Sequence, residues 1–112
     1  MSKKEPNLYE GMYVISAKLS DEARKKVYDQ IVKEIEQRGG QLLKVHERGR
    51  QKLAYEIDGH REGYYYLLYF QLLPSHIADL WKEYELCEGL VRYLTLRTEK
   101  VMEKIEFKSL EE

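Results

Sequence analysis

Hydrophobic positions near the start of the chain follow the spacing of a β-strand. Residues 9–15 (Tyr-Glu-Gly-Met-Tyr-Val-Ile) are rich in β-branched and aromatic side chains, which favour extended backbone. Gly11 interrupts this run, and a glycine inside a strand indicates that another group approaches the backbone closely. The pattern therefore predicts a first strand in which Gly11 is either approached closely by another group or lies beneath a helix.

A different spacing begins after Ser20. Apolar residues recur every four positions from Ala23 to Ile35, which predicts an amphipathic helix with one buried stripe. Ser20 is suited to cap the start of this helix, because its hydroxyl can accept a hydrogen bond from a free backbone N–H. The pair Gly39-Gly40 is typical of a helix end.

The second half of the chain predicts three more strands and one more helix. Gly49 divides the second strand and predicts a bulge or a bend in one long strand. A turn is predicted between Asp58 and Gly63, longer than a two-residue hairpin. The expected elements, in chain order, are a second strand in two parts at 41–46 and 51–57, a third strand at 64–72, a helix starting at Pro74-Ser75 and ending near Glu88-Gly89, and a fourth strand at 90–97.

The order strand, helix, strand, strand, helix, strand predicts an α+β fold of the ferredoxin-like βαββαβ type. Right-handed crossovers then give a four-stranded antiparallel sheet with both helices on one face. We expect a single domain over residues 1–112, with a core at about 8–98, a flexible lead-in at 1–7, and a tail or short helix at 99–112.

Two helices on one face leave the other face of the sheet open. In the predicted strand 64–72, side chains alternate between the two faces. If Tyr66, Leu68 and Phe70 point to the helices, the outward side chains are those of Tyr65, Leu67 and Tyr69. Three adjacent apolar side chains would form an exposed patch of a few hundred Å², which indicates a binding surface.

Composition narrows the class of protein. The chain has 112 residues and a formal net charge of −1. A net charge this close to zero predicts no general electrostatic attraction to nucleic acid. Cys87 is the single cysteine and has no partner for an intramolecular disulfide. No apolar run approaches the ~20 residues that span a bilayer, and the first residues lack the apolar segment of a signal peptide. We expect a soluble, cytoplasmic protein without membrane association.

Catalytic and cofactor motifs are missing from the sequence. The three histidines have no acidic partner at motif spacing, and the sequence contains neither a metal-ligand spacing nor a glycine-rich phosphate loop. The sequence therefore predicts a protein that is not an enzyme and that uses no cofactor, no metal and no small-molecule substrate.

Basic residues form local clusters, although the chain has nearly equal numbers of basic and acidic residues. Guanidinium groups bind phosphate oxygens in pairs and stack on unpaired bases, so these clusters indicate RNA binding. The alternative is a solvated surface that the many glutamates neutralise. The clusters contain Lys44, Arg48, Arg50 and Lys52 around Gly49, Arg92 and Arg97 in the last strand, and Lys3 and Lys4 in the lead-in.

Several motifs together resemble one known family, the bacterial small-subunit ribosomal protein six family. The resemblance runs from about Tyr9 to Thr98, and the segment Leu53-Ala54-Tyr55 is its most specific part. Glu56 stands where the family usually has proline, and Gly11 stands where it usually has an apolar residue. The matching segments are Tyr9-Glu10, Gly39-Gly40, the stretch 49–57 (Gly-Arg-Gln-Lys-Leu-Ala-Tyr-Glu-Ile), Gly63-Tyr64-Tyr65, and Val91-Arg92-Tyr93-Leu94.

The resemblance implies the ferredoxin-like fold and a structural role in the ribosome, in the cytoplasm. Members of the family bind small-subunit rRNA as a heterodimer with small-subunit ribosomal protein eighteen. Carried over by position, the resemblance implies rRNA binding by Lys3, Lys4, Tyr9, Arg48, Arg50, Arg92 and Arg97, and partner binding by Tyr65, Leu67 and Tyr69.

Two other interpretations share the predicted order of elements. One is an RNA-recognition-motif-like domain that binds single-stranded RNA, although residues 61–67 match the aromatic motif of its third strand only in part. The other is a small ferredoxin-like enzyme or metabolite-binding regulator, which would need a phosphate loop or a clustered acid/base set.

Overall fold

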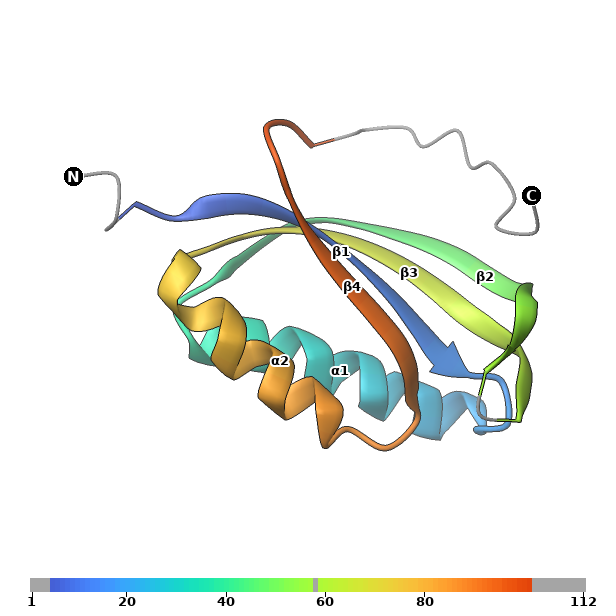
Figure 1. Ribbon diagram of the computed structural model, residues 1–112. Helices are drawn as coiled ribbons and strands as arrows, with labels where there is room; N and C mark the ends of the chain where they lie inside the picture. The colour runs from blue at the N-terminus through green and yellow to red at the C-terminus, as the bar shows by residue number, and fades with distance from the viewer. Residues whose placement is uncertain (1–4, 58, 102–112) are drawn as a thin grey trace.

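Four strands form one antiparallel sheet, and two helices cover one of its faces (Figure 1). The computed structural model describes residues 5–57 and 59–101. The strand order across the sheet is β2-β3-β1-β4, so β2 and β4 are the two edge strands. The predicted ferredoxin-like fold is confirmed. Its elements are β1 (Asn7–Ser16), α1 (Asp21–Gln37), β2 (Gln41–Ile57), β3 (His60–Leu72), a 3-10 turn η2 (Pro74–His76), α2 (Ile77–Glu85) and β4 (Leu90–Thr98).

Local signals set the ends of α1 as the sequence predicts. The Ser20 hydroxyl accepts a hydrogen bond from the backbone N–H of Ala23 at 3.1 Å, which satisfies one free donor of the first turn. At the other end, Gly39 has a φ of 80°, a backbone conformation that glycine adopts without strain. Of the apolar stripe, Val27, Ile31 and Ile35 are buried.

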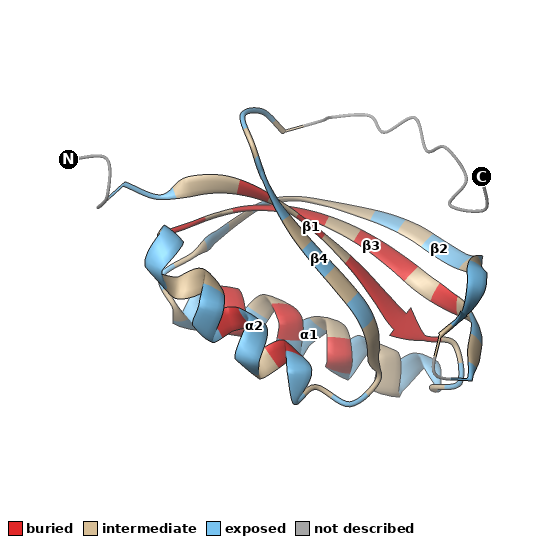
Figure 2. Ribbon diagram, viewed as in Figure 1, coloured by how far each residue is buried: buried red, intermediate tan, exposed pale blue. Residues whose placement is uncertain are grey.

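The core fills the space between the helices and the facing side of the sheet (Figure 2). Alternate residues of β1 and β3 supply the sheet side of this core. At its centre, the hydroxyls of Tyr13 and Tyr84 lie 3.0 Å apart, and the Tyr84 hydroxyl donates to the backbone oxygen of Ile31 at 3.4 Å. The close approach predicted at Gly11 is made by the Tyr13 ring, which lies directly over the glycine.

The second strand is continuous from Gln41 to Ile57, with Gly49 as an irregularity inside it. This is the single long strand that the sequence left as one alternative. The connection to β3 is shorter than the sequence analysis predicted: Ile57 pairs directly with His60, so the loop has two residues. Gly59 takes a φ of 82°, which allows the tight reversal that the longer prediction missed.

A wide bulge deforms β2 just before this turn. Lys52 pairs with Glu62 and Ile57 pairs with His60, so the four residues 53–56 stand opposite Arg61 alone. A bulge of this kind bends the strand and redirects its side chains. The residues 53–55, which carry the most specific part of the resemblance, are therefore displaced from the regular ladder.

Candidate functional site

The face of the sheet opposite the helices is the candidate site, and we call it the outer face. Tyr66, Leu68 and Phe70 belong to the helix-side core, so Tyr65, Leu67 and Tyr69 lie on the outer face as the alternation predicts. The register places side chains of β1 and β4 beside them. The cross-strand neighbours on this face are Glu10, Met12 and Val14 in β1, and Arg92, Leu94 and Leu96 in β4.

The prediction that the third strand exposes a bare apolar patch is wrong for its two tyrosines. Tyr65 is 3% exposed and Tyr69 is 0% exposed, while Leu67 is half-buried. The Tyr69 hydroxyl donates to a carboxylate oxygen of Glu10 at 2.7 Å, and its ring packs edge-on against His46. Neighbouring side chains therefore close over the centre of the sheet, which a strand taken in isolation does not reveal.

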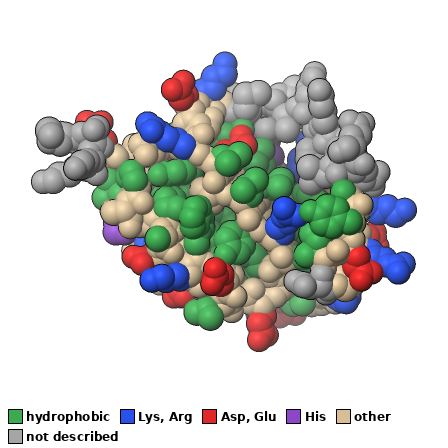
Figure 3. Space-filling view, in the orientation of Figure 1, with side chains coloured by type: hydrophobic (Ala, Val, Ile, Leu, Met, Phe, Trp, Pro, Cys, Tyr) green, Lys and Arg blue, Asp and Glu red, His purple; other side chains and the backbone are tan. Residues whose placement is uncertain are grey.

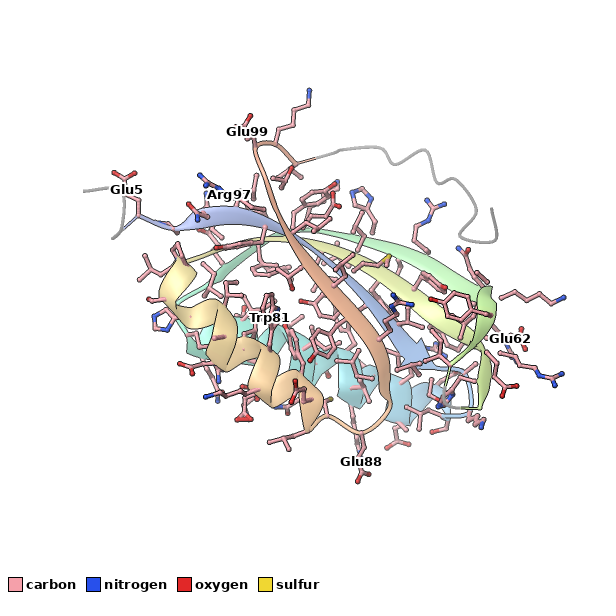
Figure 4. The ribbon with its side chains drawn as sticks, viewed as in Figure 1. Glu5, Glu62, Trp81, Glu88, Arg97 and Glu99 are labelled. Carbon is pink, nitrogen blue, oxygen red and sulfur yellow. The ribbon has the colours of Figure 1, made fainter. Side chains whose placement is uncertain are left out.

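The exposed apolar surface lies instead on the edge strand β4. Leu94 is 47% exposed and Leu96 is 51% exposed. The intervening residue Thr95 is on the helix side, where its hydroxyl accepts a hydrogen bond from the Trp81 indole at 3.1 Å. Figure 3 shows hydrophobic side chains gathered across the middle of the face on which β4 lies, and Figure 4 shows Trp81 between α2 and β4.

A hollow of about 220 Å³ opens on the outer face, and we call it the outer-face hollow. The β2 bulge supplies one wall, β4 supplies the opposite wall, and β1 and β3 supply the floor. Tyr65 belongs to this floor. The lining residues are Met12, Val14, Leu53, Ala54, Tyr55, Ile57, Tyr65, Arg92 and Leu94.

A polar contact joins the two edge strands across the rim of the hollow. The Arg92 guanidinium of β4 donates to the Tyr55 hydroxyl of β2 at 3.1 Å. The two strands are separated by β3 and β1 in the sheet, and Tyr55 lies within the bulged segment of β2. Residues 53–55 carry part of the family resemblance, but the sequence pattern did not identify them as part of a site.

The basic residues that the sequence analysis grouped are distributed over both faces and both ends of the sheet. Arg50 pairs with Tyr64 on the helix side, and its guanidinium donates twice to the Glu62 carboxylate, at 3.0 and 3.2 Å. The hydrogen bond and the negative charge of Glu62 raise the pKa of Arg50. The charge of Arg50 is therefore matched within the chain.

Arg92 and Arg97 do not share a face, because they are five positions apart on one strand. Arg97 stands opposite Tyr9, whose ring is 8% exposed and stacks on Phe70 in the helix-side core. This placement makes the Tyr9 ring part of the core. Figure 4 shows Arg97 and Glu62 at opposite ends of the molecule, so Arg97 is also far from Arg50.

The remaining predicted RNA contacts are Arg48, Lys3 and Lys4. Arg48 is half-buried, and its backbone oxygen accepts a hydrogen bond from the Gln51 amide at 3.1 Å. Lys3 and Lys4 lie outside the described residues. The structure thus unites Arg92 with the predicted partner surface and separates it from Arg50 and Arg97.

Residues 5–57 and 59–101 contain no group of three or more His, Cys, Asp or Glu side chains placed to hold a metal ion. In the same ranges, neither helix has the length and apolar character required to traverse a bilayer.

Comparison with known proteins gives consistent matches over nearly the whole chain. The family described as "Ribosomal protein S6" matches residues 8–97. The protein named "Small ribosomal subunit protein bS6" of Protochlamydia amoebophila is 64% identical over 112 residues, which is 100% of this chain and 98% of that protein. The protein of the same name from Chlamydia abortus is 54% identical over 112 residues, with 100% of both chains covered.

Solved structures give the same result for the fold. The crystal structure of 30S ribosomal protein S6 from Thermotoga maritima superposes with a TM-score of 0.79 at 30% identity, covering 84% of this chain and 89% of that one. The C-terminal domain of the MgtC protein from Mycobacterium tuberculosis superposes with a TM-score of 0.60 at 12% identity, covering 90% of this chain and 97% of that one. The second likeness concerns the fold alone.

Proposed function

The chain belongs to the ribosomal protein S6 family, and from this membership we propose that it is a structural component of the small ribosomal subunit. In this role it binds small-subunit rRNA together with ribosomal protein eighteen of the same subunit. The role requires surfaces for a protein and for RNA, and no catalytic residues.

The outer face supports the protein-binding half of this proposal. Leu94 and Leu96 are each about half exposed on one edge strand, and the outer-face hollow lies beside them. Apolar surface that borders a hollow is typical of protein interfaces, whose centres are well packed and poor in charge. The observation that carries the proposal is that the family signature at 53–55 forms a wall of this hollow.

Arg97 supports the RNA-binding half. It is exposed near the end of β4, and in the described part of the chain no carboxylate pairs with it. We propose that Arg97 contacts rRNA phosphate, with Lys3 and Lys4 as further candidates outside the described residues. Arg50 is a weaker candidate, since Glu62 already binds its guanidinium, and so is Arg48, which is half-buried.

Arg92 takes a different role in this proposal. It lies on the outer face at the rim of the hollow, so we propose that it contacts the protein partner. Leu67 and the buried rings of Tyr65 and Tyr69 support the same surface from below.

The test measures binding of the full chain to a fragment of the central domain of small-subunit rRNA, with and without ribosomal protein eighteen. We expect tight rRNA binding only when the partner is present. Arg97→Ala should weaken binding of the heterodimer to rRNA and reduce its salt dependence, because one phosphate contact is lost. Leu67→Asp should weaken heterodimer formation, and equal binding by both variants and the wild type would contradict the assignment.

The same measurements test the alternative of an RNA-recognition-motif-like domain. That function needs exposed aromatic rings on the third strand to stack on bases. Tyr65 is 3% exposed, which does not favour it. Micromolar binding of short single-stranded RNA by the chain alone, lost on Tyr65→Ala, would support the alternative.

A further inference from the structure

We propose that the outer-face hollow is the anchor site for one large apolar side chain of the protein partner, and that an acidic residue beside that side chain pairs with Arg92. This inference rests on the proposed function, because it assigns the chemistry of the partner at the same surface. It adds which part of the surface carries the affinity and what the partner must present there.

The size of the hollow favours a single side chain. Its volume of about 220 Å³ is below the ~300–1,000 Å³ of pockets that enclose small-molecule ligands. Protein interfaces, in contrast, concentrate their binding energy in a few large side chains that fill pockets near the centre of the contact. A hollow of this volume is suited to one such side chain.

The lining favours a protein side chain over a nucleobase. Recognition of a base relies on hydrogen bonds to its edges in addition to stacking. Here the walls and floor are mostly hydrocarbon, and the described polar contact between lining side chains is the one between Arg92 and Tyr55 at the rim. Six of the nine lining residues have side chains without a polar N or O atom: Met12, Val14, Leu53, Ala54, Ile57 and Leu94.

The charge of Arg92 indicates what accompanies the apolar side chain. Four other arginines, Arg24, Arg38, Arg50 and Arg61, each pair with a carboxylate of this chain. Within the described ranges, Arg92 is bonded to the neutral Tyr55 hydroxyl and to no carboxylate. A carboxylate carries the opposite charge and can accept two parallel N–H···O bonds from one guanidinium, which a single hydroxyl oxygen cannot do. A partner carboxylate at the rim would therefore complete the site.

The surface of β4 beside the hollow is also apolar. Leu94 lines the hollow and is also half exposed, and Leu96 follows it on the same face of β4. An apolar side chain in the hollow would thus lie at one end of an apolar strip that the rest of the partner can cover. The strip and the hollow together form one continuous interface.

The experiment fills the hollow and reverses its charge in separate variants of the full chain. Ala54→Trp places a large side chain at the rim of the hollow, at a residue that is itself exposed. Arg92→Glu keeps the hollow and repels the proposed carboxylate. The matched controls are Leu86→Trp, at an exposed leucine after α2, and Lys33→Glu, at an exposed lysine of α1 on the opposite side of the sheet from the hollow. Circular dichroism and the melting temperature verify that each variant is folded.

Affinity for purified ribosomal protein eighteen is then measured by titration calorimetry without RNA. We expect Ala54→Trp and Arg92→Glu each to weaken binding at least tenfold, and both controls to change it less than twofold. Replacing the acidic residues of the partner by lysine one at a time should restore binding to the Arg92→Glu variant at one position. Since Arg92 is exposed, this arm remains decisive if Ala54→Trp does not fold.

The outcomes separate this inference from the proposed function. If the wild-type chain binds neither the partner nor the rRNA fragment with it, the proposed function is wrong. If the wild type binds the partner and both variants bind equally well, the anchor site is wrong while the function stands. If Ala54→Trp retains the partner but loses rRNA, the hollow holds RNA, and the inference is overturned.

Discussion

Gly11 and Tyr13 lie on the same face of β1, and the contact between them makes a sharp test of the packing. A Cβ atom built on Gly11 would lie 2.8 Å from both Cε2 and the hydroxyl oxygen of the Tyr13 ring. The ring has little room to move, since it is 0% exposed, bonds Tyr84 through its hydroxyl and packs edge-on against the Tyr84 ring at 5.3 Å. We therefore predict that Gly11→Ala destabilises the protein.

Two opposing contributions set the size of the effect. Replacing glycine by alanine restricts the unfolded chain, which stabilises the fold by about 0.4–1 kcal/mol where the backbone allows it. Overpacking a well-filled core costs about 1–3 kcal/mol. We expect the second contribution to win, because the clash involves a ring that is held at its far end. The predicted net loss in the free energy of unfolding is about 0.5–2 kcal/mol.

A double-mutant cycle with Tyr13→Leu isolates this contact. Leucine ends before the outer ring atoms that a Cβ at position 11 would meet, so Gly11→Ala should be neutral or slightly stabilising in that background. The coupling energy between the two positions should be about 1–3 kcal/mol, measured by urea unfolding with unchanged m-values. If Gly11→Ala has the same effect in both backgrounds, the Tyr13 ring is not the obstacle and the reasoning fails.

Two further predictions concern the same core. Ile31 is 1% exposed, so Ile31→Ala should lower the free energy of unfolding by about 2–5 kcal/mol in urea titrations, and a loss below about 1 kcal/mol would contradict its place in the core. Burial raises the pKa of Tyr84 above its ordinary value of 10.0, so the folded state keeps a proton that the unfolded chain releases. Stability should therefore fall as the pH rises above about 10, by up to about 1.4 kcal/mol per pH unit for this group. Tyr84→Phe should make this decline less steep, and identical slopes for the two proteins would contradict the shift.

Features that depend on neighbours along the chain were predictable from the sequence. The cap at Ser20, the buried stripe of α1 and the glycine at its end were each confirmed because they follow from contacts within a few residues. The order of elements then determined the fold, since few topologies satisfy right-handed crossovers. The turn at 58–59 was predicted too long, because its boundaries depend on pairing between β2 and β3.

The candidate site was only partly predictable, for two different reasons. Residues 92 and 97 differ by an odd number, so the period of two already placed Arg92 and Arg97 on opposite faces of a regular strand. Applying that rule would have separated the RNA and partner candidates from the sequence alone. The contact between Arg92 and Tyr55 is different in kind, since it joins two edge strands and involves a residue in the segment where four residues of β2 bulge against one of β3. A pattern along the chain carries no information on which positions a bulge displaces, so the hollow and its rim become visible only in three dimensions.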